Sequence, residues 1–167
     1  MPFYSNLRKE NYMIKIMFVC HGNICRSPMA EFVMKKIVKD AGMENMFHIE
    51  SSATSTEEIG NPVYPPARKI LAEHDIRCDG KFARQITLDD YRNFDYIIVM
   101  DYNNIRNLNR IIGSDTDNKV HLLMHYTGYE KGVADPWYTR NFQATWKDVN
   151  EGCQALFEYI LENLRID

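Results

Sequence analysis

The sequence predicts an α/β fold, in which helices flank a parallel sheet on both faces. Apolar runs of strand length recur along the chain, most clearly at residues 14–19 and 95–100. Between such runs lie segments whose apolar residues recur at helical spacing, as in residues 28–42. Alternation of this kind is typical of parallel sheets, whose ligands bind beyond the carboxyl ends of the strands.

The first half of the chain supplies two strands and two helices. Residues 14–19, "IKIMFV", are apolar throughout, as in a strand that is buried on both faces. The helix over residues 28–42 sets lysines opposite its apolar face and meets a stop signal at Gly42. A second strand is expected over residues 46–52, and a helix opened by two prolines over residues 65–76.

The second half continues the alternation. Residues 82–87 are expected to form a short strand, and Thr87 with Asp90 resembles a capping box for the next helix. A strand over residues 95–100 follows, and Asp101 is expected to cap the helix after it. Support of the site is a second role open to Asp101, although capping alone explains the residue.

A strand over residues 120–126 and a long helix over residues 142–164 complete the expected elements. Apolar residues recur every three or four positions along this last helix. The residues expected on its core side are Trp146, Val149, Cys153, Leu156, Phe157, Ile160 and Leu164.

Length and composition indicate a single domain over residues 13–167, preceded by a loose extension over residues 1–12. The net charge of -3 gives no general attraction to nucleic acid or to an anionic membrane. Four unevenly spaced cysteines and the lack of a signal-peptide pattern indicate reduced thiols in the cytoplasm. A zinc site at the cysteine-rich loop would lack a second ligand cluster, so no metal or other cofactor is expected.

The segment between Cys20 and Arg26 has the features of an anion-binding loop. Gly22 lets the backbone approach a ligand closely, Ser27 suits a helix N-cap and Pro28 suits the first helical position. Backbone N–H groups of such a loop, together with the start of a helix, can hold the oxygens of a phosphate group. The predicted phosphate-binding loop comprises Cys20, His21, Gly22, Asn23, Ile24, Cys25, Arg26 and Ser27.

Two side chains of this loop indicate phosphoryl transfer. Arg26 offers a planar fork that binds two oxygens of a phosphate group. The donors that favour phosphate also favour a thiolate, so Cys20 is expected to attack phosphorus and form a phosphocysteine. A lone cysteine after an apolar strand is more often a buried core thiol, but the Cys-x5-Arg-Ser-Pro pattern favours the catalytic interpretation.

The segment "DPWY" supplies what this chemistry still needs. An oxygen that leaves phosphorus requires a proton, and the carboxyl group of Asp135 can donate it and later take one from water. Trp137 and Tyr138 can form the wall of a slot for a flat ring. The same four residues also suit an ordinary turn with two half-buried aromatic side chains.

Several motifs together resemble the low-molecular-weight protein tyrosine phosphatases. The resemblance covers nearly all of the chain from residue 13 onward and keeps the order of the family's motifs. It implies a four-stranded parallel sheet, no metal, and hydrolysis of phosphotyrosine and small aryl phosphates through a cysteinyl phosphate. It also implies a phosphotyrosine protein as substrate, such as a tyrosine kinase or one of its targets. The motifs are "VCHGNICRSPMAE", "SSATS", "IGNPVYPPARKIL", "ARQIT", "FDYIIVMD" and "DPWY".

The resemblance also implies roles for individual residues. Cys20 corresponds to the nucleophile, Arg26 to the residue that stabilises the transition state, and Asp135 to the general acid. Ser27 corresponds to the serine that helps the sulfur to leave in the second step.

Asn23 corresponds to a residue that holds the loop's shape through a polar network. The family's serine and histidine in this network are matched here by Ser51 and His74. An ordinary strand hydroxyl and a solvated histidine are the alternatives for these two positions.

Three positions raise further questions. His21 stands where the family usually has an aliphatic residue, and Glu57 where an aromatic or apolar residue often lines the entrance. A carboxylate at the mouth predicts a preference for basic over acidic phosphopeptides, although a plain solvated glutamate is an alternative. Cys25 suits either a small loop residue or a partner in a protective disulfide with Cys20.

Three other functions share parts of this pattern. Arsenate reductases use a similar loop with a pair of downstream cysteines, whereas Cys78 is alone in its region and Cys153 lies on the core side of a helix. A carrier that passes phosphate from cysteine to a sugar would not need Asp135. A phosphotyrosine-binding module would keep the loop but not both the thiol and the acid, and would bind without turnover.

Overall fold

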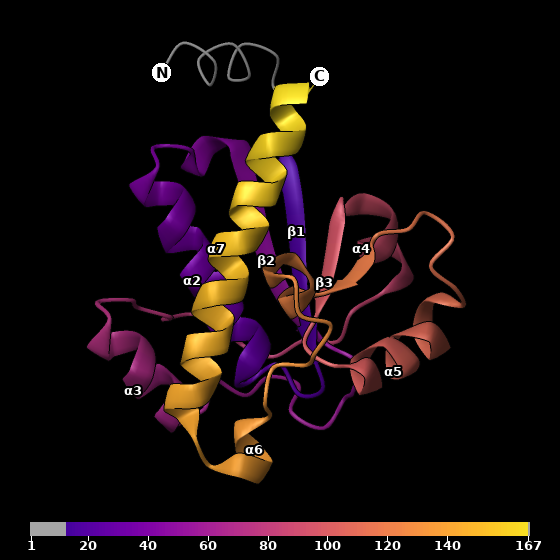
Figure 1. The fold of residues 1–167 in the computed structure, drawn as a ribbon. Coiled ribbons are helices and arrows are strands. Elements are labelled where there is room, and N and C mark those ends of the chain that lie inside the picture. Colours follow the sequence, from indigo (N-terminus) through magenta and orange to yellow (C-terminus); the bar gives the residue numbers. More distant parts are fainter. Residues whose placement is uncertain (1–12, 167) are drawn as a thin grey trace.

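The computed structural model of the protein describes residues 13–166, so the extension expected over residues 1–12 lies outside the described part. Its centre is a sheet of four parallel strands in the order β2-β1-β3-β4 (Figure 1). The four-stranded parallel sheet implied by the resemblance is therefore confirmed. The strands are β1 (Ile14–Cys20), β2 (Phe47–Ala53), β3 (Tyr96–Val99) and β4 (Val120–Leu122).

Helices cover both faces of the sheet, as Figure 1 shows. Helices α2 (Arg26–Asp40), α3 (Pro65–Glu73) and α7 (Phe142–Ile166) pack on one face. Helices α4 (Leu88–Asn93) and α5 (Tyr102–Ile112) pack on the other. The remaining helical segments are α6 (Pro136–Thr139) and the 3-10 turns η1 (Glu44–Met46) and η2 (Leu123–Thr127).

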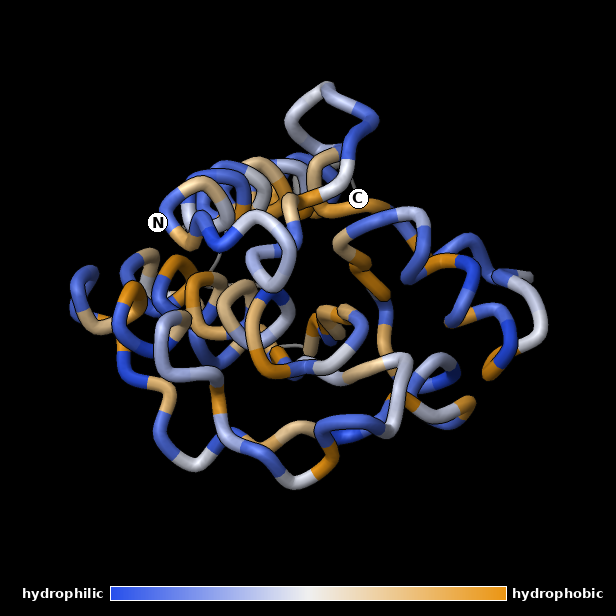
Figure 2. The backbone as a smooth tube through the Cα atoms, turned by 90° about the horizontal axis from the view of Figure 1, so that it is seen from below, coloured by the Kyte–Doolittle hydropathy of each residue, from blue (hydrophilic) through white to orange (hydrophobic). Residues whose placement is uncertain are grey.

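The apolar run of β1 follows from this two-sided cover. Successive side chains of a strand point to opposite faces. Ile16 and Phe18 therefore join the larger core beneath α2 and α7, while Met17 and Val19 join the smaller core beneath α4 and α5. The helices in turn alternate between hydrophobic and hydrophilic stretches along their course (Figure 2).

Two predicted helix starts are confirmed with their caps. The side chain of Thr87 accepts a hydrogen bond from Asp90 N, and the carboxylate of Asp90 accepts one from Thr87 N. Asp101 and Asn104 form the same reciprocal arrangement at the start of α5. Each cap thus satisfies backbone N–H groups that a helix start leaves without a partner.

Two predicted strands differ from the structure. Residues 82–87 form only isolated bridges. The segment pairs with β2 only at Ala53, the last residue of that strand, so no continuous ladder of hydrogen bonds can form. The strand expected over residues 120–126 stops at Leu122, where the backbone turns into η2.

The sheet order places a ligand site at the end of β1. The chain leaves β1 toward β2 on one side and later returns to β3 on the other. Ligands of such sheets bind where the order reverses, outside the carboxyl ends of the strands. Cys20 is the last residue of β1.

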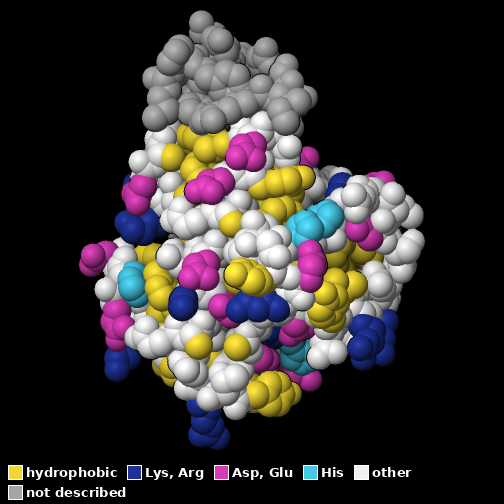
Figure 3. Space-filling view, viewed as in Figure 1, with side chains coloured by type: hydrophobic (Ala, Val, Ile, Leu, Met, Phe, Trp, Pro, Cys, Tyr) yellow, Lys and Arg dark blue, Asp and Glu magenta, His cyan; other side chains and the backbone are white. Residues whose placement is uncertain are grey.

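The face of the molecule shown in Figure 3 carries acidic and basic side chains in a mixed distribution. Neither sign of charge gathers over this whole face, in keeping with the small net charge of -3. No helix within residues 13–166 combines the length and the apolar character needed to cross a membrane.

Candidate active site

The loop between β1 and α2 turns around the sulfur of Cys20. Asn23 has a φ of 61°, in the left-handed region that asparagine tolerates better than most residues. Its backbone N–H donates a hydrogen bond to Cys20 Sγ at 3.3 Å. The strained position thus directs a backbone donor toward the thiol, and Asn23 itself is buried.

Ser27 lies on the other side of the same sulfur. Its Oγ is 3.0 Å from Cys20 Sγ, and it accepts a hydrogen bond from Asn23 Nδ2 at 2.8 Å. The prediction that Ser27 caps α2 is wrong, because α2 begins at Arg26 and its N-cap, Cys25, makes no side-chain hydrogen bond. The Ser27 hydroxyl group contacts the Cys20 sulfur and does not cap the helix.

Arg26 is held by acceptors from two separate segments. Its side chain is 3% exposed, and one terminal nitrogen donates to Asp101 Oδ2 at 2.7 Å and to the carbonyl of Val133 at 3.0 Å. The other terminal nitrogen lies 3.4 Å from Asp135 Oδ2. Burial alone would lower the pKa of Arg26, but the Cys20 sulfur and the two carboxylates raise it. The guanidinium group is therefore charged and oriented before any ligand binds.

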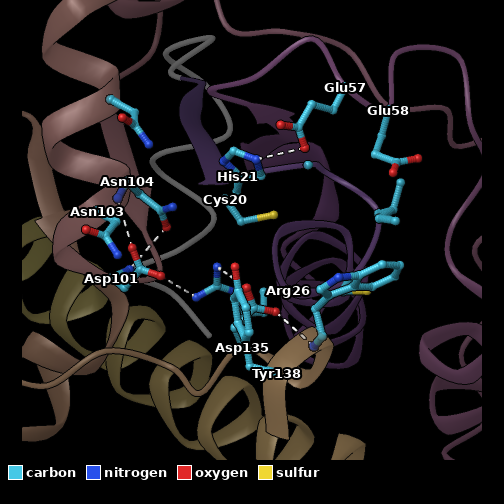
Figure 4. Close-up of a pocket in the computed structure, with 15 residues that line it drawn as sticks. Cys20, His21, Arg26, Glu57, Glu58, Asp101, Asn103, Asn104, Asp135 and Tyr138 are labelled. Carbon is cyan, nitrogen blue, oxygen red and sulfur yellow. Dashed lines mark hydrogen bonds and ion pairs between the residues drawn. The ribbon is translucent and has the colours of Figure 1, made fainter. Parts of the chain in front are cut away.

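Asp135 joins the site from the segment before α7. One carboxylate oxygen accepts a hydrogen bond from Trp137 N at 3.0 Å, while the other faces Arg26. Trp137 and Tyr138 are 57% and 84% exposed, and the Trp137 ring lies 5.4 Å from that of Tyr64. Figure 4 shows Asp135 and Tyr138 on the side of the pocket opposite Glu57.

These groups surround a cavity of about 570 Å³. At its mouth, His21 Nε2 lies 3.0 Å from Glu57 Oε2, so the two unusual positions of the sequence contact each other (Figure 4). The lining residues are Cys20, His21, Gly22, Ile24, Cys25, Arg26, Glu57, Glu58, Asp101, Asn103, Asn104, Asn107, Asp135, Trp137 and Tyr138.

The polar network behind the loop contains Ser51 but not His74. Asn23 Nδ2 donates to Ser51 Oγ at 2.9 Å, as the resemblance implies. The imidazole of His74 instead stacks on Trp146, with ring centroids 3.9 Å apart and planes at 10°. His74 is the exposed C-cap of α3, on the side facing α7, so its assignment to the network is wrong.

Two charged residues that sequence reasoning missed complete the network. Glu31 Oε1 accepts a hydrogen bond from Ser51 Oγ at 2.6 Å, and Lys81 Nζ donates to the carbonyl of Ser51 at 2.7 Å. Glu31 falls on the buried side of α2, where a carboxylate interrupts an apolar face. That interruption was the available signal for Glu31, whereas Lys81 lies in an irregular segment that carries none.

Asp101 was predicted as a helix cap, and the structure gives it a second contact. Its Oδ1 accepts from Asn104 N at 2.8 Å while its Oδ2 accepts from Arg26. The position of Asp101 directly after β3 offered a signal, because β3 lies beside β1 and their carboxyl ends meet at one edge.

The four cysteines are free thiols in this structure. Burial, with the nearby Cys20 and Asp135, raises the pKa of Cys25 to about 12, so Cys25 is no rival nucleophile at neutral pH. Burial also raises the pKa of Cys78 and Cys153, and neither lines the cavity. Within residues 13–166, no cluster of three or more His, Cys, Asp or Glu side chains is arranged to hold a metal ion.

Fold and site together define an α/β protein with a cysteine and an arginine in one strand-loop-helix cradle, the arrangement of cysteine-dependent phosphatases. The sequence model described as low molecular weight phosphotyrosine protein phosphatase matches residues 15–166. The chain therefore belongs to the low-molecular-weight phosphotyrosine protein phosphatase family, and the predicted enzyme class, a protein tyrosine phosphatase, is confirmed.

Individual relatives agree with this assignment. The low molecular weight phosphotyrosine protein phosphatase of Gallus gallus is 40% identical over 148 residues, 86% of this chain and 93% of the relative. The crystal structure of YfkJ from Bacillus subtilis superimposes with a TM-score of 0.87 at 36% identity, covering 90% of this chain and 96% of that one. The low molecular weight protein tyrosine phosphatase SP-PTP from Streptococcus pyogenes is 45% identical with a TM-score of 0.78, covering 88% of this chain and 93% of that one.

Proposed function

We propose that the protein hydrolyses phosphotyrosine in protein substrates, and small aryl phosphates, in two steps through a phosphocysteine at Cys20. The observation that carries this proposal is the set of contacts around one sulfur. Asn23 N and Ser27 Oγ lie 3.3 and 3.0 Å from Cys20 Sγ, and the oriented guanidinium of Arg26 lines the same cavity. A nucleophile and an anion-binding fork are thus held within one eight-residue loop.

In the first step the Cys20 thiolate attacks phosphorus and the bond from phosphorus to the tyrosine oxygen breaks. Two phosphate oxygens bind the fork of Arg26, which offsets the charge that develops on them. The leaving phenolate takes its proton from the carboxyl group of Asp135. The products of this step are tyrosine, an ionised Asp135 and a phosphoryl group on sulfur.

In the second step water attacks the phosphocysteine and the bond from sulfur to phosphorus breaks. Asp135 takes one proton from the attacking water, which returns the carboxyl group to its starting state. Ser27 donates a hydrogen bond to the sulfur as its negative charge returns. Inorganic phosphate leaves and the thiolate is restored.

The entrance of the cavity supports an aryl substrate. Trp137 and Tyr138 are exposed aromatic side chains at the rim, and Glu57 places a carboxylate across the pocket from Tyr138 (Figure 4). We expect the aromatic pair to contact the tyrosine ring and Glu57 to favour basic residues near the phosphotyrosine. A tyrosine kinase or one of its targets, met in the cytoplasm, is the kind of partner we propose.

The arsenate reductase alternative finds no support at the site. That chemistry relays a disulfide through two further cysteines. Cys153 is fully buried beneath α2 with its Sγ 3.7 Å from the carbonyl of Ala30, and Cys78 is 3% exposed and does not line the cavity. Neither is placed to attack a sulfur at the bottom of this pocket.

The proposal is tested by hydrolysis of para-nitrophenyl phosphate and of a phosphotyrosine peptide, under reducing conditions and without added metal. We expect turnover by the intact protein and none above background by Cys20→Ser. Cys78→Ser is the matched control, since it makes the same change at a buried thiol outside the cavity. Peptide binding without turnover by the intact protein would contradict the proposal and favour a binding module.

A further inference from the structure

We infer that Lys81 and Glu31 are positioning residues, which set the direction of a hydrogen-bond relay that ends on the Cys20 sulfur. The inference rests on the proposed function, since it concerns how the nucleophile is prepared. Neither residue lines the cavity. Their effect must therefore pass through Ser51, Asn23 and Ser27.

Glu31 is a buried carboxylate between two lysines. It is 4% exposed, and its Oε1 receives the Ser51 hydroxyl at 2.6 Å. Lys81 Nζ lies 3.4 Å from the same oxygen, while Lys35 Nζ lies 2.5 Å from Oε2. Lys81 is the inner partner, because its side chain is 11% exposed whereas that of Lys35 is 44% exposed.

The chemistry of a carboxylate fixes the first link of the relay. An ionised carboxylate only accepts hydrogen bonds, so the Ser51 hydroxyl must donate to Glu31. The lone pairs of Ser51 Oγ are then left for Asn23 Nδ2, which lies 2.9 Å away. The orientation of the Asn23 amide follows, and its Oδ1 accepts from Arg84 N at 3.2 Å.

The second link reaches the nucleophile. The other Nδ2 hydrogen of Asn23 is donated to Ser27 Oγ at 2.8 Å, which occupies a lone pair of that hydroxyl. The Ser27 hydrogen is then free for Cys20 Sγ at 3.0 Å, and the competing carbonyl of Ser52 is farther away at 3.4 Å. Every donor in the chain thus points toward the sulfur and favours its ionised form.

Lys81 is the inner cation that pairs with the carboxylate at the start of this chain. Burial lowers the pKa of Lys81, and the charge of Glu31 opposes that shift, so the two groups depend on each other. Removing the inner cation would leave a buried charge with one solvent-exposed partner. Lys81 also donates to the carbonyl of Ser51, so its removal would free both the Glu31 carboxylate and the Ser51 segment from the position that fixes the direction of the relay.

The test measures the alkylation rate of Cys20 by iodoacetate across pH, without any substrate. In Lys81→Met we expect the midpoint of the rate curve to move to higher pH. Each unit of that movement slows alkylation about tenfold below the midpoint. Lys81→Arg, which keeps the cation, should stay close to the intact protein. In a Ser51→Ala background, where the relay is cut, Lys81→Met should cause no further shift.

Lys36→Met is the control, since it removes an exposed lysine of α2 that pairs with Asp40. Cys20→Ser identifies alkylation at other thiols. If Lys81→Met does not fold, as judged by circular dichroism, Glu31→Gln carries the test with the same expected shift. A folded Lys81→Met or Glu31→Gln variant with the curve of the intact protein would overturn the inference. Lack of turnover by an intact protein that shows the expected shifts would instead overturn the proposed function alone.

Discussion

At the scale of single residues, the site is organised before substrate arrives. Arg26 is 3% exposed and already bonded to Asp101 and to the carbonyl of Val133. Orientation that exists beforehand lowers the free energy of activation, because the charged fork need not reorganise during the reaction. The longer contact of 3.4 Å to Asp135 leaves that carboxyl group the most loosely held partner of Arg26.

Asp135→Asn should slow the enzyme most on substrates with poor leaving groups. Without the carboxyl proton, the rate for a phosphotyrosine peptide should fall by about 10² to 10⁴, the usual contribution of a general acid. The rate for para-nitrophenyl phosphate should fall less, because nitrophenolate leaves with little need of a proton. Steady-state kcat/KM on the two substrates checks this, because it reports the first step and not the hydrolysis of the phosphocysteine that both substrates share. An equal loss of kcat/KM on both would contradict the role of Asp135 as general acid.

The residues of the Cys20 loop were predictable, as were Ser51 and Asp135, whereas Lys81 was not. Cys20, Arg26 and Ser27 belong to one continuous motif, so spacing alone brought them together. His74 and Lys81 lie seven positions apart in the segment that follows α3, where no periodicity shows which side chain turns inward. Asp75, with a φ of 60°, turns the chain there, while the imidazole of His74 stacks on Trp146 of α7.

At the scale of elements, close contact between α7 and η2 depends on the absence of a side chain. A Cβ at Gly152 would lie 2.5 Å from Leu123 Cγ. Gly152 thus allows the long helix to approach the 3-10 turn that follows β4. The 3-10 turn η2 also ends β4, which was expected to reach residue 126. The hydrophobic pattern could not show this end, because Leu122 and Leu123 would be buried in a strand as well as in a 3-10 turn.

Gly152→Ala should destabilise the protein although alanine is the better helix former. Overpacking of this kind costs about 1–3 kcal/mol, against a gain of about 1 kcal/mol in helix propensity. Urea unfolding followed by circular dichroism measures the net change in the free energy of unfolding. Gln154→Ala, at an exposed position of the same helix, is the control and should change stability little. A more stable Gly152→Ala variant would show that α7 and η2 can separate freely.

At the scale of the whole molecule, the acidic mouth matters more than the net charge. The surface of Figure 3 mixes both signs, whereas Glu57 and Glu58 lie together at the cavity. A local field of this kind acts on the residues that flank a bound phosphotyrosine and is screened by salt within about 10 Å. His21, paired with Glu57, moderates that field when its ring is protonated.

Glu57→Gln should reduce the preference for basic over acidic phosphotyrosine peptides. An exposed charge contact contributes about 0–1 kcal/mol, so the ratio of kcat/KM values should change by up to about fivefold. The change should shrink at high ionic strength. Glu44→Gln is the control, because Glu44 precedes the amino end of β2, at the edge of the sheet away from the pocket. An unchanged ranking of the peptides would show that Glu57 is merely solvated.

The central claim is that phosphate passes through the sulfur of Cys20, and rapid acid quenching of the enzyme during turnover tests it most directly. Peptide mass spectrometry of the quenched Asp135→Asn protein with para-nitrophenyl phosphate should find a phosphoryl group on Cys20. The modified fraction should rise within the first turnover and disappear once substrate is consumed. Turnover with no phosphorylated Cys20, or with the phosphoryl group on another residue, would contradict the account.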